Sequence, residues 1–378
     1  MKIISLGTID KKILFAIIGG CFKMIANIVL YHSDASIVSH PCILGINTSL
    51  GIFLSVFPFL YINRTKLICK KKEKEDILIY NFPGTNNNNN KFILIILVSI
   101  LDFIQKFISL FFVKLFLENF WIFDSFFLLI FSRIILNERQ YLHHFISLVA
   151  IIIIGIILIV INYHGEEIPF LKVFVTLLIE IIYSLENVIS KFIMNTKYYT
   201  PYIICATAGT LELILFIIIL IIFTQIPISC IDYMNCFNDT YVDDISDYFE
   251  NITFKEILIF ILVMFSRLIF LLFGFLLIDA FTPIHLILIL IIGEISFLFV
   301  DAYDWKLYLK LVFFIILIFF ILIFTEIIEL NVWNIQKNTK KNIFQRSNTE
   351  RNNIDQMIML INENEIGERK VSETSNDI

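Results

Sequence analysis

The sequence predicts an all-α protein that crosses a membrane, and three observations lead to this fold class. Hydrophobic residues make up 58% of the 378 residues and charged residues only 17%, whereas charged residues form about 25% of an average soluble domain. The apolar residues are grouped in ten runs, each close to the roughly 20 residues that a helix needs to cross a bilayer. Charged residues gather mainly between these runs. A soluble core of this size would need polar faces to cover it, so lipid is the expected environment.

Ten transmembrane helices are expected from these runs. They lie at 13–31, 42–62, 91–112, 117–136, 141–163, 169–190, 200–223, 257–278, 283–301 and 307–329. Together they form one membrane domain over 1–330. The remaining residues, 331–378, are rich in Asn, Glu and Lys, so they are expected to form a mostly disordered tail.

The connections between the runs support this division. Lys23 interrupts the apolar centre of the first run, so this run is expected to remain as a span and not to be cleaved as a signal peptide. Segment 63–90 is charged and then Asn-rich, which is typical of a linker. Spans 4 and 5 are joined by a short polar turn at 137–140, and Pro283 is expected to open span 9 as its first helical residue.

The distribution of charge predicts the orientation. Lys and Arg crowd the segment 63–91, whereas 32–41 has neither and 224–256 has only Lys255. The positive-inside rule places the basic segment and the N-terminus in the cytosol, and the other two segments on the opposite side. An even number of spans returns the basic C-terminal tail to the cytosol.

The long segment 224–256 contains candidate modification sites. Cys230 and Cys236 lie close together on the predicted non-cytosolic side, where a disulfide can persist; two free thiols are the alternative. The sequons at Asn238 and Asn251 are candidate glycosylation sites, although such sequons also arise by chance in Asn-rich chains.

A weak internal similarity divides the spans into two halves. The polar turn NERQY (137–141) opens the last span of the first half, and DAYDW (301–305) opens the last span of the second. The two turns lie five spans apart, so they face opposite sides of the membrane. This arrangement predicts a ten-helix bundle of two five-helix inverted repeats, a device that transporters use for alternating access.

Charged groups at bilayer depth are costly and usually face a cavity or a partner. In span 6, Glu180, Ser184, Asn187 and Lys191 follow at i, i+4, i+7 and i+11, which places them on one helical stripe beside Glu186. The functional interpretation is a cavity wall in which Glu180 or Glu186 contacts a substrate amine or carries a proton. The structural alternative is an interhelical hydrogen bond or a buried ion pair.

Two other spans contain polar pairs. Asp102 and Gln105 lie three residues apart in span 3, where the carboxylate either couples transport to protons or serves in a structural pair. Lys23 and Asn27 lie one turn apart in span 1, and Lys23 either binds an anionic substrate or neutralises Asp102. Asp124 is expected at the rim of span 4.

Arg267, in the middle of span 8, is the strongest candidate for binding an anion. An ion pair with an acid such as Glu294 is the open alternative. His143 and His144 stand at a predicted span end without companion ligands and are expected to be interfacial, while Glu326 is expected to face cytosolic water.

These residues and their neighbours resemble the drug/metabolite transporter (EamA-like) superfamily, in particular its solute-carrier 35 branch of nucleotide-sugar-transporter-like and chloroquine-resistance-transporter-like proteins. The resemblance rests on His40-Pro41, Asp102, the passage RIILNERQYLHHFISL (133–148) with Gly155, and the polar span 6 at 180–191. It covers about 13–330. It implies ten helices, both termini in the cytosol and a central cavity lined by both halves. One departure is the lack of an acid at Leu50-Gly51.

The expected function is that of a secondary transporter, which moves a small organic solute across an endomembrane by alternating access, with or without proton coupling. The Golgi, a lysosome or a vacuole is favoured over the plasma membrane. The sequence has no HExxH motif and no Gly-rich phosphate loop, so we expect no enzyme activity, cofactor or metal. Besides lipid and solute, no nucleic-acid partner is expected, and the protein is a monomer or a dimer. A multipass membrane enzyme and a non-transporting scaffold or receptor are the alternatives.

Overall fold

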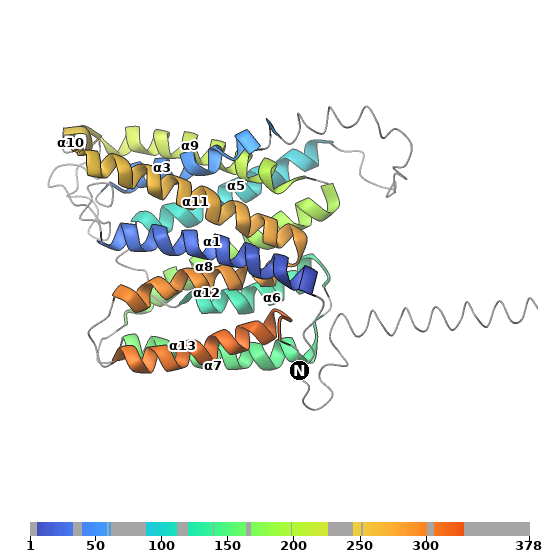
Figure 1. Cartoon of the computed structure of the whole chain (residues 1–378). Coiled ribbons are helices and arrows are strands. Elements are labelled where there is room, and N and C mark those ends of the chain that lie inside the picture. Colours follow the sequence, from blue (N-terminus) through green and yellow to red (C-terminus); the bar gives the residue numbers. More distant parts are fainter. Residues whose placement is uncertain are drawn as a thin grey trace, which may run out of the picture.

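The computed structural model describes residues 6–32, 40–58, 60–61, 88–111, 120–138, 140–163, 168–197, 199–225, 245–250, 252–300 and 306–328. These residues form helices and short connections, without any β-strand among them. The long helices lie side by side in one bundle (Figure 1). The expected all-α class is therefore confirmed for the described part of the chain. The predicted tail and almost all of the predicted linker lie outside it.

Eight helices in the described residues are long and apolar enough to cross a membrane, as a multi-pass membrane protein requires. They are α1 (Leu6–His32), α3 (Pro41–Phe53, whose apolar stretch continues to Pro58), α5 (Asn88–Phe111), α7 (Leu142–Asn162), α8 (Phe170–Lys197), α9 (Pro201–Phe223), α11 (Phe254–Ala280) and α13 (Lys306–Phe324).

The two other predicted spans, 117–136 and 283–301, correspond to shorter helices. In the first, the 3₁₀ turn η2 (Phe120–Phe123) leads into α6 (Asp124–Ile135). In the second, η4 (Pro283–His285) leads into α12 (Leu286–Val300). Pro283 opens η4 as expected, because a proline lacks the N–H that a helix start leaves unpaired. A further short helix, α10 (Ile245–Glu250), was not expected within the polar segment 224–256.

Local sequence explains where several helices begin and end. Pro41 and Pro201 stand in the first turns of α3 and α9, and the Thr253 side chain accepts a hydrogen bond from the Glu256 N–H at the start of α11. After α6 the chain turns at Asn137, which has a φ of 53°. Asn adopts this left-handed conformation more readily than most residues, so it terminates the helix at low cost.

Contacts between helices show how the bundle is assembled. The most extensive contacts join α1 with α12 and α11, α3 with α9 and α11, α5 with α8 and α9, α6 with α8, and α7 with α13. Glycines allow some of these approaches. A Cβ on Gly51 would lie 2.3 Å from the carbonyl oxygen of Met264, and one on Gly209 would lie 2.4 Å from the nitrogen of Phe53. Small residues of this kind let membrane helices approach closely.

The helices of the bundle run between two ends, end A and end B. End A is the end at which α1 begins, on the right in Figure 1, and end B is the opposite end, next to α10. Lys23 and Asn27 of α1 contact Glu294 and Ser296 of α12 respectively, so these two helices run parallel. Contacts between α3 and α9 show that they run antiparallel.

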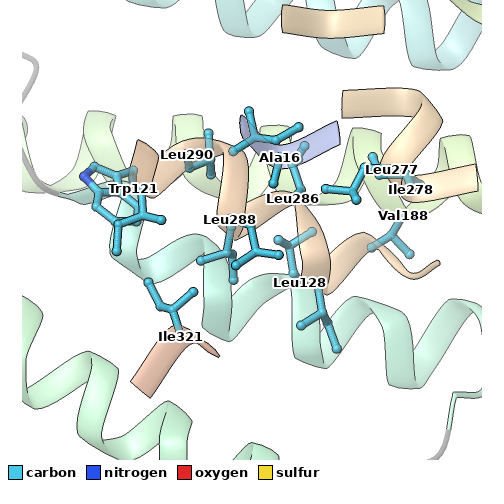
Figure 2. Close-up of a cluster of buried hydrophobic side chains, with 14 of the residues drawn as sticks. Ala16, Trp121, Leu128, Val188, Leu277, Ile278, Leu286, Leu288, Leu290 and Ile321 are labelled. Carbon is cyan, nitrogen blue, oxygen red and sulfur yellow. The ribbon is translucent and has the colours of Figure 1, made fainter. Parts of the chain in front are cut away.

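The largest buried hydrophobic cluster includes a layer that lies toward end A. We call this layer the end-A seal. It consists of Ala16, Leu128, Val188, Leu277, Ile278 and Leu286. These side chains are at most 2% exposed, and they gather from α1, α6, α8, α11 and α12 (Figure 2). Five helices from both ends of the chain thus meet in one apolar layer.

Candidate functional site

A cavity of about 400 Å³ with charged residues in its lining lies inside the bundle, within the size range of small-molecule sites. Its walls come from α1, α3, α5, η2, α6, α8, α11 and α12. The charged residues that line it are Lys23, Asp102, Lys106, Asp124, Glu180, Arg267 and Glu294. The uncharged polar and aromatic residues include Asn27, Thr48, Gln105, Ser109, Trp121 and Tyr183. The cavity thus collects charges that the sequence distributes over six helices.

The cavity extends toward end B. Its α1 residues follow the midpoint of that helix, and its α5 residues, from Asp102 to Leu110, belong to the last part of α5. Its α8 residues, from Ile179 to Tyr183, belong to the first half of a helix that runs the opposite way. The end-A seal lies beyond the other side of the cavity. The interior of the bundle is therefore lined by charged residues toward end B and filled by packed apolar residues toward end A.

Lys23 forms the first ion pair of the cavity. Its Nζ lies 2.6 Å from Oε1 of Glu294, and Asn27 Nδ2 approaches Ser296 Oγ at 3.5 Å. Lys23 was expected either to bind an anionic substrate or to neutralise Asp102. The second alternative is wrong, because Lys23 forms its ion pair with Glu294. This pair joins α1 to α12 beside the cavity.

Lys106 forms the second charged group and was not among the expected site residues. Its Nζ lies 2.8 Å from Asp102 Oδ2 and 2.7 Å from Glu212 Oε2. Ser49 Oγ donates a further hydrogen bond to Glu212 Oε2 over 3.1 Å. The spacing of Asp102 and Lys106 at i and i+4 is a standard helical ion pair and was the signal that could have identified Lys106.

Asp124 and Glu180 form a pair of acids in the cavity wall. Their side chains lie within hydrogen-bonding reach of each other, and Ser184 Oγ donates to Asp124 Oδ1 over 2.9 Å. Asp124 is 1% exposed. It is thus part of the wall and not of the rim, which corrects the expectation for this residue.

Arg267 differs from the two lysines. Among the residues that the structure describes, it has no ion pair or hydrogen bond, and its Nε is buried without a hydrogen-bond partner. The expected alternative partner, Glu294, is bonded to Lys23. Arg267 is therefore a cation inside the bundle whose guanidinium is free to bind another group.

The other residues of the predicted span 6 stripe lie outside the lining of the cavity. Ser184 is bonded to Asp124 as described, and Asn187 Nδ2 donates to the Tyr183 carbonyl over 2.8 Å. Glu186 is 2% exposed. Lys191 Nζ donates to the Asp279 carbonyl over 2.7 Å, toward end A. Of this stripe, only Glu180 reaches the cavity. The candidate sites at Cys230, Cys236, Asn238 and Asn251 lie outside the described residues.

His143 and His144 have a companion that the sequence did not reveal. Glu326 Oε1 lies 3.3 Å from Nε2 of His143 and 3.7 Å from Nε2 of His144, and the three residues offer ligand atoms within 4.8 Å of one another. Glu326 has a φ of 56°, an uncommon conformation for Glu. The expectation that the two histidines lack companions is wrong, because the chain after α13 folds back onto the start of α7.

The hydrogen bonding of His144 does not suit a metal ligand. Its Nδ1 accepts a hydrogen bond from the Tyr141 N–H over 3.2 Å, which leaves the ring proton on Nε2, the atom that faces Glu326. A histidine that binds metal through Nε2 normally donates from Nδ1. The three residues thus fit a polar contact between α7 and α13 better than a metal site.

Comparison of the sequence with protein-family models gives no match, and comparison with curated proteins gives none either.

Proposed function

We propose that this protein is a secondary transporter that moves a small organic solute across a membrane by alternating access. The observation that carries the proposal is the charged cavity, because it lies inside a bundle of helices that are long and apolar enough to cross a membrane, with the apolar end-A seal on one side of it. Charged groups at this depth are costly, and they usually mark a solute or ion pathway. A cavity that is closed at one end is what one state of a transporter requires.

The pattern of helix contacts supports a bundle of two inverted halves. If the two halves are inverted repeats, each helix of the first half corresponds to one of the second: α1 to α8, α3 to α9, α5 to α11, α6 to α12, and α7 to α13. Each contact between two helices should then have a counterpart between their corresponding helices. The pair α1–α12 then becomes α8–α6, α1–α11 becomes α8–α5, and α3–α11 becomes α9–α5. The pairs α3–α9 and α7–α13 are unchanged. All of these are pairs with extensive contact. An internal two-fold relation accounts for this set, and such a relation is what alternating access around a fixed site needs.

Polar contacts follow the same exchange. The pair α1–α12 contains the Lys23–Glu294 ion pair, and its counterpart α8–α6 contains the acids Asp124 and Glu180. Both polar contacts line the one cavity. A site between the two halves would be lined in this way, with each half contributing a polar helix pair.

The class of transporter and its orientation belong to the proposal as well. The layout described above is the one that the resemblance to the drug/metabolite transporter superfamily implies. With the N-terminus in the cytosol, end A faces the cytosol, and the cavity extends toward the interior of an organelle such as the Golgi, a lysosome or a vacuole. Among the acids considered for proton coupling, Glu180 has the most suitable surroundings, because it lies beside a second acid, Asp124, with which it could share a proton, whereas Asp102 is held by Lys106.

Reconstitution into liposomes tests the proposal. Purified protein is tested for uptake and exchange across a panel of sugars, nucleotides, amines and peptides, with and without a pH gradient. We expect saturable movement of at least one solute, lost in a Lys23→Gln, Lys106→Gln double variant and retained in Glu250→Gln, which changes an exposed residue of α10. Absence of uptake and exchange for every solute, from protein shown to be folded, contradicts the proposal.

A further inference from the structure

We infer that the transported solute carries an anionic oxygen group, a carboxylate or a phosphate, and that this group binds Arg267. The inference rests on the proposed function of the cavity and names the chemistry of its solute. It follows from the partners of the three cations that line the cavity.

Two of these cations are already neutralised within the protein. Lys23 lies 2.6 Å from Glu294, and Lys106 lies 2.8 Å from Asp102 and 2.7 Å from Glu212. At these distances each ammonium group forms a charge-assisted hydrogen bond with at least one carboxylate oxygen. The charge of each lysine is thus matched by a carboxylate of the protein.

Arg267 is the cation that remains. Asp102 and Glu294 lie near enough for their charges to act on it, yet each is bonded to a lysine and neither forms an ion pair with the guanidinium. A buried charge without a partner is strongly unfavourable. The planar fork of a guanidinium matches the paired oxygens of a carboxylate or a phosphate. A solute anion would therefore supply the missing partner.

Each of the four acids that line the cavity already has a partner within the protein. Asp102 and Glu294 are held by lysines, and Asp124 and Glu180 lie within hydrogen-bonding reach of each other. An incoming cation would find no carboxylate without a partner among these four. Among the described residues, Arg267 is thus the cation of the lining that lacks an ion pair.

Small oxyanions provide a test that does not require the natural solute. The thermal unfolding midpoint of the purified full chain is measured in detergent with added inorganic phosphate, with acetate, and with chloride or choline chloride at the same ionic strength. Because a ligand that binds only the folded state stabilises it, we expect phosphate or acetate to raise the midpoint beyond the chloride control in a concentration-dependent manner. The two salts distinguish a phosphate from a carboxylate as the preferred group.

Two variants connect the shift to the guanidinium. In Arg267→Gln the shift should be abolished, and in Arg267→Lys, which keeps the charge without the fork, it should be reduced. The matched control Arg133→Gln changes an exposed arginine of α6 and should keep the full shift. If Arg267→Gln does not fold, the reduction in Arg267→Lys decides. The inference is overturned if neither oxyanion exceeds chloride, if choline alone stabilises the protein, or if the Arg267 variants respond like the wild type.

Transport measurements separate this inference from the proposed function. If a neutral or cationic solute is transported equally fast by the wild type and by Arg267→Gln, the proposed transport function stands and the inference of an anionic solute is overturned. Arg267-dependent stabilisation by an oxyanion, without uptake or exchange of any anion, would keep the binding site and contradict transport.

Discussion

The same helices build both the cavity and the end-A seal, but they direct different residues inward in the two places. The contrasting pairs are Lys23 and Ala16 in α1, Asp124 and Leu128 in α6, Glu180 and Val188 in α8, and Glu294 and Leu286 in α12. In each helix a charged residue lines the cavity and a small or aliphatic one lies in the seal, within about one to three helical turns of it. The contrast therefore arises along single helices and not between different ones.

This difference gives one bundle a charged space toward one end and a packed apolar layer toward the other. Charged side chains keep a space polar and draw in water or solute, whereas aliphatic side chains pack densely and leave no room for either. In the proposed transporter, the other state would open the seal and close the cavity toward end B. Apolar packing is suited to that task, because its contacts separate without leaving a charge unpaired.

The largest effect is expected when a charged residue of the cavity loses its ion-pair partner. Glu294→Gln leaves Lys23 buried without its ion pair, and breaking a buried pair costs about 3–5 kcal/mol. We expect a loss of this size in the free energy of unfolding, measured by denaturant titration in detergent micelles. Glu250→Gln, at an exposed position, should change it by less than about 0.5 kcal/mol.

A second substitution separates pairing from packing at the same site. The double variant Lys23→Met, Glu294→Leu removes both charges, and replacement of a buried pair by apolar residues is often neutral. It should recover most of the stability that Glu294→Gln loses. If the double variant is no more stable than Glu294→Gln, the ion pair does not account for the loss.

The next effect concerns the seal. Leu286 is 2% exposed, and truncation of such a side chain to Ala leaves a cavity that costs about 2–5 kcal/mol. The matched variant Leu258→Ala shortens a leucine that is 51% exposed on the bundle surface and should cost much less. Equal losses in the two variants would show that the seal is not a packed layer.

A smaller effect is expected at the approach between α3 and α11 beside the cavity. Gly51→Ala places a Cβ 2.3 Å from the Met264 carbonyl oxygen, and relief of such overpacking costs about 1–3 kcal/mol. Gly274→Ala meets only the end of the Leu286 side chain, at 3.3 Å, and should be close to neutral. Thermal unfolding of the two variants side by side measures the difference; a neutral Gly51→Ala would contradict the close approach.

The helices were largely predictable from the sequence, because the length of an apolar run is a direct consequence of bilayer thickness. All ten predicted spans overlap helical segments among the described residues. The sequence did not reveal that α6 and α12 are shortened, since a 3₁₀ turn at a helix start leaves no periodic signal. It also missed α10, whose six residues are too few for a recognisable pattern.

The site was predictable in part of its residues but not in their pairing. Six of the nine predicted cavity residues line the cavity, namely Lys23, Asn27, Asp102, Gln105, Glu180 and Arg267. The other three, Ser184, Glu186 and Asn187, lie outside its lining, and Lys106 was missed. Which charges meet depends on which helices pack together. Lys23 and Glu294 are 271 positions apart, so nothing local in the sequence connects them.

The measurement that tests the central claim most directly is the accessibility of a single cysteine from each side of the membrane. In a background without the six native cysteines, Ser109→Cys places a thiol in the cavity toward end B, and Ala16→Cys places one in the end-A seal. A membrane-impermeant maleimide is then applied to one face of oriented proteoliposomes at a time. The proposed transporter predicts that Ser109→Cys reacts only from the face at end B and that Ala16→Cys does not react from that face. Reaction of Ser109→Cys from both faces, or from neither, would contradict a solute cavity that is closed at end A.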